Sequence, residues 1–315
     1  MASLRKIALI IISLSVLVSC GSNDKLVRKR KAKSANDITL LPQIDKEDLK
    51  AKKLKVKSKS TYSYFYDKFG KVASKGYFVE KRTYDKNGNL SLIFRYSSRG
   101  GIDLSWKYDY DYYQNLTHKD SKTGSGLLKY ESTSKFDDYG NEIEREEFVE
   151  KTGKYNKIIF AYDSLSNLLS KKTFNSDDEL ISTGKNQYDA SNNLVHSILL
   201  NKNGSKYFEK IVKYDSLNRR VYESENKFSE PATEYKYLYD KNGFLSEKSS
   251  RIYRETFKND SLGNVIEQKI YDGSGGLQQM YTYMYKRNGL IKERIRYDGL
   301  EHPALYTKYE YEYYK

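Results

Sequence analysis

The sequence predicts an all-β protein, a long antiparallel β-meander of about twenty strands. A short motif that begins with Tyr-Asp, or a close variant of it, recurs along the chain, most often every 26 residues. The 315 residues include 32 tyrosines, which suit a pleated surface, and only 3 prolines, which cannot donate to a sheet ladder. A hydrophobic content of 38% with a mean hydropathy of -0.83 favours thin layers over a thick core.

The recurring motif sets the architecture. Its copies begin at positions 66, 84, 110, 136, 162, 188, 214, 239, 259, 285 and 311, so seven of the ten steps are 26 residues long. A fixed period of this length indicates an array of one small structural unit. Within a unit, such as residues 154–172, side chains alternate with period two on both sides of the motif, as in a β-hairpin.

Two turns separate the strands of each unit. In the first turn the Asp of the motif is expected to accept backbone amides, and the Asn or Gly that follows supplies a positive φ. A second turn falls midway between successive motifs, as at residues 97–101 and 273–276. Each repeat therefore contributes two strands, and because the connections are short, consecutive strands run antiparallel.

The two faces of this sheet are expected to differ. Tyrosines at alternate positions define an aromatic face: Tyr62, Tyr64, Tyr66, Tyr235, Tyr237, Tyr239, Tyr281, Tyr283 and Tyr285. The same face is expected to carry the aliphatic residue after each motif and the residue six positions later: Leu90, Leu116, Leu168, Leu194, Leu245 and Ile291, then Tyr96, Phe148, Phe174, Leu200, Tyr271 and Tyr297. The polar face carries Lys107, Thr133, Lys171, Lys185, Lys236 and Arg294. Since open sheets of more than about ten strands curl, we expect a spiral, shell or large open barrel with its aromatic face inward, and a flat sheet is the alternative.

The N-terminus predicts export. Arg5 and Lys6 precede an apolar run, residues 7–18, that is too short to span a bilayer comfortably and has the shape of a secretory signal. Leu17, Val18, Ser19 and Cys20 resemble the lipobox of bacterial lipoproteins. This resemblance implies removal of residues 1–19 as a lipoprotein signal peptide and acylation of Cys20, with chains such as palmitate. Cys20 is the only cysteine, which excludes a disulfide within the chain, although an ordinary signal peptide with an incidental cysteine remains the alternative.

Residues 20–60 are expected to form the lipidated cysteine and a basic flexible tether. Residues 21–60 hold 13 basic and 5 acidic side chains, a net +8 of the total +14. Such a segment stays disordered, either lying on anionic headgroups or acting as a solvated spacer. Residues 61–315 hold only +4, because residues 1–20 carry the other +2, and this balance lacks the basic stripe of a nucleic-acid-binding domain. We therefore expect a membrane partner and no nucleic acid.

The repeats at residues 61–315 have a recognisable pattern. Turns such as Tyr-Asp-Lys-Asn-Gly-Asn at residues 84–89, with two strands per unit, resemble YD repeats, the building block of RHS-type proteins. The resemblance implies a spiralling β-shell and carbohydrate binding. Some RHS-type proteins enclose a C-terminal toxin, but here the last motif begins four residues before the final residue, and no self-cleavage motif of the DPxG type is evident. Toxin delivery is therefore not expected.

We expect no catalytic site, cofactor or metal site. The histidines are His118, His196 and His302, and the first two share one face but lie three repeats apart, too far for a paired metal site. With Cys20 acylated, no Cys/His nucleophile remains. The carboxylates show no pair placed for glycoside hydrolysis.

These observations favour a non-enzymatic lipoprotein of the bacterial envelope whose repeat array binds or scaffolds a glycan or protein ligand. Gly21 after the cysteine lacks the Asp associated with inner-membrane retention, which favours the outer membrane, with the array facing the periplasm or the surface. An accessory or immunity component of an RHS-like toxin system and a hydrolase of envelope polymers are the alternatives. The oligomeric state stays open.

Overall fold

A computed structural model describes residues 43–67 and 69–315 of the chain. Within these residues it contains one helix, α3 (Gln43–Lys53), and twenty strands. No helix in this part of the chain combines the length and hydropathy needed to cross a membrane. The predictions for residues 1–42, including the lipobox Leu17, Val18 and Ser19 and the acylated Cys20, lie outside the described residues.

The strands follow one another along the chain, and each pairs antiparallel with the next. Their bounds are β1 (Val56–Phe65), β2 (Tyr77–Tyr84), β3 (Leu90–Tyr96), β4 (Ile102–Tyr110), β5 (Leu116–Thr123), β6 (Leu128–Phe136), β7 (Glu142–Val149), β8 (Lys154–Tyr162), β9 (Leu168–Phe174), β10 (Leu180–Tyr188), β11 (Leu194–Asn201), β12 (Lys206–Tyr214), β13 (Arg220–Asn226), β14 (Thr233–Tyr239), β15 (Leu245–Ser250), β16 (Tyr253–Asn259), β17 (Val265–Asp272), β18 (Leu277–Tyr285), β19 (Ile291–Tyr297) and β20 (Pro303–Tyr313).

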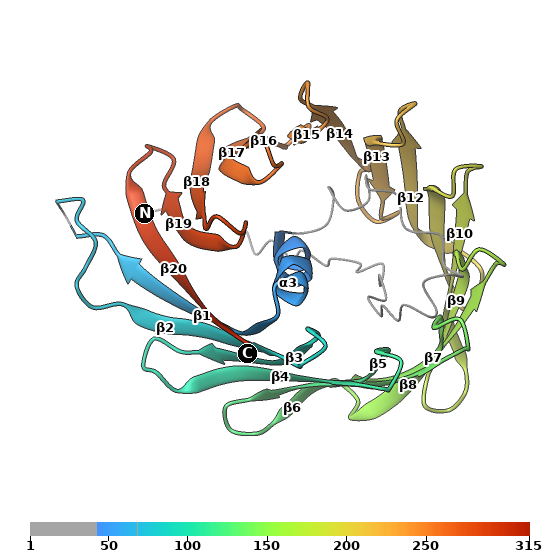
Figure 1. Ribbon diagram of the computed structural model, residues 1–315. Helices are drawn as coiled ribbons and strands as arrows, with labels where there is room; N and C mark the ends of the chain where they lie inside the picture. Colours follow the sequence, from blue (N-terminus) through green and yellow to red (C-terminus); the bar gives the residue numbers. More distant parts are fainter. Residues whose placement is uncertain (1–42, 68) are drawn as a thin grey trace, which may run out of the picture.

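The sheet closes on itself. β1 pairs with β20 as well as with β2, through nine aligned residue pairs that run from Val56↔Tyr313 to Phe65↔Leu305. The result is a barrel with α3 inside it (Figure 1). The predicted all-β meander of about twenty strands is confirmed. The sheet curls into a closed barrel, and not into an open shell or a flat sheet. Twenty strands spaced about 4.8 Å apart give a wall on the order of 30 Å across before strand tilt widens it.

Ten of the eleven motifs lie at chain reversals, as predicted, and the last, which begins at Tyr311, lies within β20. In the β8–β9 turn, Oδ1 of Asp163 accepts the backbone N–H groups of Leu165 and Asn167, each at 2.8 Å, and Oδ2 accepts Nδ2 of Asn167 at 2.8 Å. The residue three positions after the start of each such turn has a positive φ in ten turns: Gly70, Gly88, Gln114, Gly140, Ser166, Asn192, Asn218, Gly243, Gly263 and Gly289. Because several of these are not glycine, the side-chain bonds of the Asp help to hold the conformation.

The first tyrosine of several motifs ties one hairpin to the one before it. The hydroxyl of Tyr110, at the end of β4, donates to the carbonyl of Leu90, at the start of β3, at 2.9 Å. The same bond spans twenty residues at Tyr188–Leu168, Tyr214–Leu194, Tyr285–Val265 and Tyr311–Ile291, at 2.8–3.0 Å. The motif therefore has two functions: its Asp closes a turn and its Tyr joins neighbouring repeats.

The turns occupy the two ends of the barrel. We call the end with the turns after even-numbered strands the first rim, and the end with the turns after odd-numbered strands the second rim. The motif that begins at Tyr66 closes the β1–β2 turn and therefore lies on the second rim, opposite the nine that follow. Its step of 18 residues, instead of 26, reflects this change of rim.

A β-bulge after the turn controls which side chains face inward. Tyr162 pairs with Leu168, but Ala161 pairs with Ser170, so Leu169 is an extra residue in β9. The bulge keeps Leu168 on the face of Tyr162 and reverses the alternation beyond it. Side chains that contact α3 mark the inner face, and the strand pairing extends this assignment around the barrel.

The predicted faces are only partly right. The tyrosine triplets of β14 and β18 and the aliphatic residues after the motifs face inward as predicted, and Lys107, Thr133, Lys185 and Lys236 face outward. The prediction is wrong for residues beyond a bulge. Lys171 and Arg294 face inward. The residues that face outward instead of inward are Tyr96, Phe148, Phe174, Leu200, Tyr271 and Tyr297. It is also wrong for Tyr62 and Tyr64, which face outward because β1 is offset from the regular repeat.

Part of the predicted tether, residues 20–60, belongs to the folded barrel. α3 begins at Gln43 and β1 at Val56, so the folded part starts before residue 61. The lysine-rich composition suggested a solvated segment, but Lys50, Lys52 and Lys59 bind partners inside the barrel. Composition does not reveal partners that are distant in sequence.

The tyrosine bond between repeats is testable. Tyr188→Phe keeps the ring and removes the bond to Leu168, and we expect it to lower the free energy of unfolding by about 1 kcal/mol, measured in urea. The control is Tyr207→Phe, because Tyr207 is 43% exposed and should change stability little. Equal losses in the two variants would show that the bond does not stabilise the barrel.

Candidate functional site

The inner wall of the barrel and the helix that lies against it form the candidate site. α3 sits near the first rim, where Ala51 packs with Val56, Tyr84 and Leu290 in a buried apolar cluster. These residues come from α3, β1, β2 and the β18–β19 turn, and none is more than 2% exposed. The cluster therefore fixes the helix against the wall beside the β1–β20 seam.

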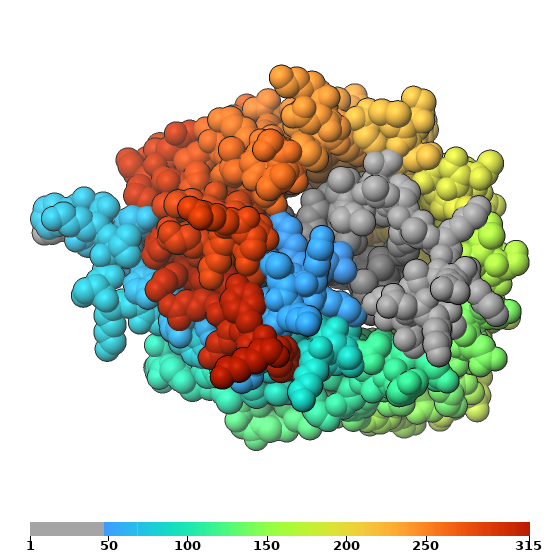
Figure 2. Space-filling model, in the orientation of Figure 1, coloured from blue at the N-terminus to red at the C-terminus, as the bar shows by residue number. Residues whose placement is uncertain are grey.

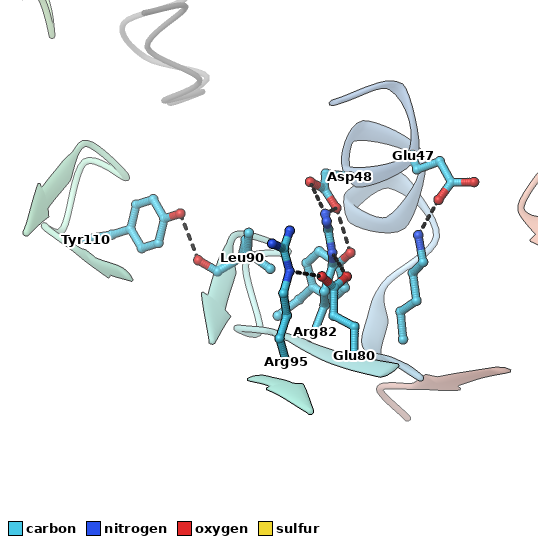
Figure 3. Close-up of polar contacts among 9 residues, drawn as sticks. Glu47, Asp48, Glu80, Arg82, Leu90, Arg95 and Tyr110 are labelled. Atoms are coloured by element: carbon cyan, nitrogen blue, oxygen red, sulfur yellow. Dashed lines mark hydrogen bonds and ion pairs between the residues drawn. The ribbon is translucent and has the colours of Figure 1, made fainter. Parts of the chain in front are cut away.

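A buried ion network holds the middle of the helix (Figure 3). Nη1 of Arg82 lies 3.1 Å from Oδ2 of Asp48, and Nε of Arg82 lies 2.7 Å from Oε1 of Glu80. Glu80 also pairs with Nε of Arg95 at 3.1 Å. The hydroxyl of Tyr84 donates to Oδ1 of Asp48 at 2.7 Å. On the next strand, Lys59 pairs with Glu47 of the helix.

The network shifts the ionisation of its members. Burial would raise the pKa of Glu80, but the charge and hydrogen bonds of Arg82 and Arg95 outweigh it and hold that pKa below its usual range. Burial, together with the neighbouring Asp48, raises the pKa of Tyr84. Both groups therefore keep their ordinary charge at neutral pH, an ionised carboxylate and a neutral hydroxyl.

Turn residues of the first rim receive the lysines of the helix. Nζ of Lys50 donates to Oδ1 of Asn264 at 2.6 Å and to the carbonyl of Gly289 at 3.0 Å. Nζ of Lys52 donates to Oδ1 of Asn89 at 2.9 Å. Asn264 and Asn89 also donate to the Asp of their own turns. The repeated turn thus presents acceptor oxygens around the rim, and α3 binds three of these turns.

The inner wall from β13 to β20 is rich in tyrosine. Its inward tyrosines are Tyr235, Tyr237, Tyr239, Tyr253, Tyr281, Tyr283, Tyr285, Tyr309 and Tyr311. Charged groups between them are paired, as in Arg220–Glu223 at 2.7 Å and Lys210–Glu225 at 3.0 Å. Nζ of Lys248 lies 4.3 Å from the ring centre of Tyr235. We call this region the tyrosine arc.

Hydrogen bonding on the inner wall is incomplete. Five buried side-chain atoms among the described residues have no partner: Oε1 of Glu47, Nε of Arg220, Oγ of Ser250, Nε of Arg294 and Oγ1 of Thr307. All five belong to α3 or to inward positions of β13, β15, β19 and β20. An unsatisfied buried group costs about 1–3 kcal/mol, so these atoms lower the stability of the inner wall.

The outer wall has a different chemistry. Charged side chains pair across neighbouring strands, as in Lys135–Glu144 at 2.6 Å and Lys258–Glu267 at 2.8 Å. His118 and His196 lie on this face, as predicted, each within 3.2 Å of a carboxylate of the adjacent strand, Glu131 and Glu209 respectively. His302 lies in the β19–β20 turn. Among the residues that the structure describes, no group of three His, Cys, Asp or Glu side chains is arranged to hold a metal ion.

Comparisons with known proteins give only weak structural similarity. No protein-family model matches the chain, and no curated protein matches it. The crystal structure of TcdB2-TccC3-Cdc42 is similar over 75% of this chain, with a TM-score of 0.39 and 13% identity, and this chain spans only 13% of its length. A porin-like protein from Bacteroides uniformis is similar over 82% of this chain and 98% of its own, with a TM-score of 0.37 and 9% identity. Similarities this low carry no functional argument.

The Glu80 network should make the barrel sensitive to acid. The pKa of Glu80 is lower in the folded protein than in the unfolded chain. Ionised Glu80 therefore stabilises the fold fully when the pH is above the ordinary pKa of a glutamate, and this stabilisation is lost as the pH falls through the lowered pKa. Glu80→Gln should therefore reduce stability at pH 7 by about 1–3 kcal/mol. In acid, where wild-type Glu80 is protonated, the two proteins should converge.

Thermal unfolding followed by circular dichroism from neutral to acid pH measures this effect. Glu146→Gln is the control, because Glu146 is exposed on the outer wall and an exposed charge contributes little. A Glu80→Gln protein as stable as wild type at pH 7, or one whose deficit persists unchanged in acid, would contradict the expected role of the network.

Proposed function

We propose that this protein is a non-enzymatic lipoprotein of the bacterial envelope whose barrel is a binding or structural scaffold. In this proposal acyl chains on Cys20 hold it to the membrane, the outer membrane in preference to the inner. The tyrosine arc of the inner wall receives a glycan or protein ligand. The observation that supports it most is the closed sheet that turns rows of tyrosines and paired charges toward its interior.

The tyrosine arc suits a ligand rich in hydroxyl or amide groups. Tyrosine rings offer a large flat contact area with little conformational freedom to lose, and their hydroxyls form directed hydrogen bonds. Burial raises the pKa of Tyr309 and of Tyr239 to about 12, so these hydroxyls remain protonated donors at neutral pH. The paired charges add further donors and acceptors.

The chemistry of the outer wall favours a membrane anchor that is separate from the barrel. Lys107, Lys135 and Lys258 face outward along the strands, and a lysine on a lipid-facing barrel wall costs about 2–4 kcal/mol at the bilayer midplane. Such a wall favours contact with water. Several methylenes per acyl chain at about 0.8 kcal/mol each would hold Cys20 in the membrane instead.

The ionisation of the carboxylates supports a role without catalysis. Acid catalysis of glycoside hydrolysis uses a carboxylic acid whose pKa is raised. In the described part of the chain, every carboxylate with a resolved pKa shift is shifted downward: Glu80, Asp109, Glu131, Glu144, Asp163, Asp189, Glu209, Asp215, Asp260, Asp272 and Asp298. These groups favour the charged form, which suits turn closure and ion pairing.

Both parts of the proposal can be tested on the full chain produced in a bacterium. Wild-type protein should incorporate a labelled palmitate analogue and remain with the membrane fraction, whereas Cys20→Ala should lose the label. Purified protein should retain a glycan from an envelope digest or a protein from an envelope extract. Tyr281→Leu, in the tyrosine arc, should weaken this retention about tenfold.

The control is Tyr271→Leu, because Tyr271 is also half-buried but faces outward. Retention by this variant should equal that of wild type. Palmitate labelling that survives Cys20→Ala would refute the anchor. Retention unaffected by Tyr281→Leu, or absent from wild type, would refute the assignment of a ligand to the tyrosine arc.

A further inference from the structure

The two sides of the first rim differ in charge. Nine motif turns lie on this rim, and five of them contain or bind a cation. Four contain one within the turn: Lys86, Arg219, Lys241 and Lys286. The fifth is the turn of Asn264, which binds Lys50 of α3. The remaining four turns are consecutive, and we call them the acidic half-rim: residues 111–115, 137–141, 163–167 and 189–193.

We propose that the acidic half-rim binds a lysine-rich segment of a partner protein. Its acids are Asp111, Asp137, Asp138, Asp163 and Asp189, and it contains no lysine or arginine. It follows the turns from β4 to β11, along the lower and right side of the barrel in Figure 1 and in the green and yellow-green part of Figure 2. The site is therefore separate from the tyrosine arc, which runs from β13 to β20.

The lysines of α3 show how such a turn binds an ammonium group. Nδ2 of Asn89 donates to Oδ2 of Asp85 at 3.1 Å, which leaves Oδ1 of the amide as an acceptor. Nζ of Lys52 donates to this oxygen at 2.9 Å. In the same way, Oδ1 of Asn264 accepts Nζ of Lys50 at 2.6 Å. The fold therefore contains two examples of a lysine bound by the asparagine of this turn.

Each turn of the acidic half-rim repeats this arrangement. Its asparagine donates Nδ2 to the Asp four residues earlier, at 2.8–3.0 Å, in Asn115, Asn141, Asn167 and Asn193. Asn115, Asn141 and Asn193 are only 5–8% exposed, so their amides are held in place. None of the described residues donates to Oδ1 of these four asparagines. The four turns therefore present the acceptor that binds a lysine in the two turns beside α3.

Cations of the neighbouring strands do not offset the acidic charge. Within three residues of the four turns, all of which the structure describes, the one lysine or arginine is Lys135, and it pairs with Glu144 at 2.6 Å. Asp109 and Glu142 add acidic charge over the same stretch. The other strand cations lie four or more residues from a turn, about 13 Å or more along the strand. The acidic half-rim therefore has a negative potential that attracts cations.

Exposed tyrosines lie beside these acids. Tyr112 is 88% exposed and Tyr113 is 54% exposed, next to Asp111 in the β4–β5 turn. A tyrosine ring attracts an ammonium group placed over its face, as in the tyrosine arc, where Nζ of Lys248 lies 4.3 Å from the ring centre of Tyr235. A single amide oxygen and an open ring suit the compact ammonium of lysine, whereas the arginine fork favours bidentate partners.

The spacing of the turns predicts the form of the partner. Successive turns of the acidic half-rim are two strands apart, about 9.6 Å. An extended peptide advances about 3.3–3.6 Å per residue, so lysines at every third position would meet successive turns. We therefore expect the partner to offer an extended segment that crosses the ends of the strands from β4 to β11.

Peptide binding tests the site. The probe is a short fluorescent peptide with lysine at every third position and serine between, and the protein is the full chain carrying Cys20→Ala, which lacks the acylation site. Fluorescence anisotropy should show binding that weakens as salt is added, because the contact joins opposite charges. The same peptide with acetylated lysines should bind about tenfold more weakly or worse, because acetylation removes the charge.

Two lysines added to the acidic half-rim should weaken peptide binding. Ser164→Lys with Ala190→Lys places each lysine one residue after a turn Asp, the position that Lys86 and Lys241 occupy in their own turns. The affinity of this variant for the peptide should fall about tenfold or more, because like charges repel.

The matched control adds the same charge elsewhere on the first rim. Ser216→Lys with Ser261→Lys places two lysines at the same turn position outside the acidic half-rim, and all four substituted residues are exposed. This variant should bind the peptide as the parent does. No binding by the parent, equal losses in the two lysine variants, or equal binding of the acetylated peptide would overturn the proposal.

The basic residues 28–31 of the same chain are the alternative occupant. If the peptide binds only after all four are changed to Gln, the chain itself occupies the acidic half-rim, and the proposed partner is wrong. These outcomes are separate from those of the proposed function, because none of them changes palmitate labelling of Cys20 or ligand retention by the tyrosine arc.

Discussion

The structure depends on the pairing of β1 with β20. A meander of twenty strands has two free edges, and an exposed edge carries unpaired backbone groups that template association with other chains. Nine aligned residue pairs across the β1–β20 seam remove both edges at once. Closure also gives the sheet an inside and an outside. The contacts with α3 show which face is the inside, and strand pairing carries that assignment around the barrel.

A closed barrel of this size has an interior too wide for the side chains of its wall to fill, and α3 occupies part of that interior. A barrel of about eight strands can be filled by its own side chains, but one of twenty cannot. Here the wall keeps its interior polar, with paired charges and hydrogen-bonded tyrosines, and places an apolar cluster only where Ala51 of α3 meets Tyr84 and Leu290. An interior that is wide and polar suits ligand binding better than it suits a compact core. The proposed scaffold function is based on this wide, polar interior.

The sequence was most informative where one residue type serves one local purpose. The turn Asp and the inward tyrosines of β14 and β18 were predictable, because turn chemistry and period-two alternation are local. The outward position of Tyr96 and the inward position of Arg294 were not, since a one-residue bulge between motif and strand reverses the face. α3 was missed because its lysines and acids find their partners, such as Arg82 and Asn264, only across the closed barrel. Closure was not predictable from the motif either. The last motif, which begins at Tyr311, lies in β20 and pairs with β1, whereas the other motifs form turns.

A disulfide across the seam tests closure most directly. Ser60 and Glu310 are aligned partners on β1 and β20, and residues paired in this way lie about 4.5–5.5 Å apart between their Cα atoms, within the range that a disulfide spans. With Cys20→Ala removing the natural thiol, Ser60→Cys and Glu310→Cys should form an intramolecular bond under mild oxidation and raise the mobility of the chain on a non-reducing gel. A protein that folds to the same β-rich spectrum but forms no such bond would contradict a closed barrel.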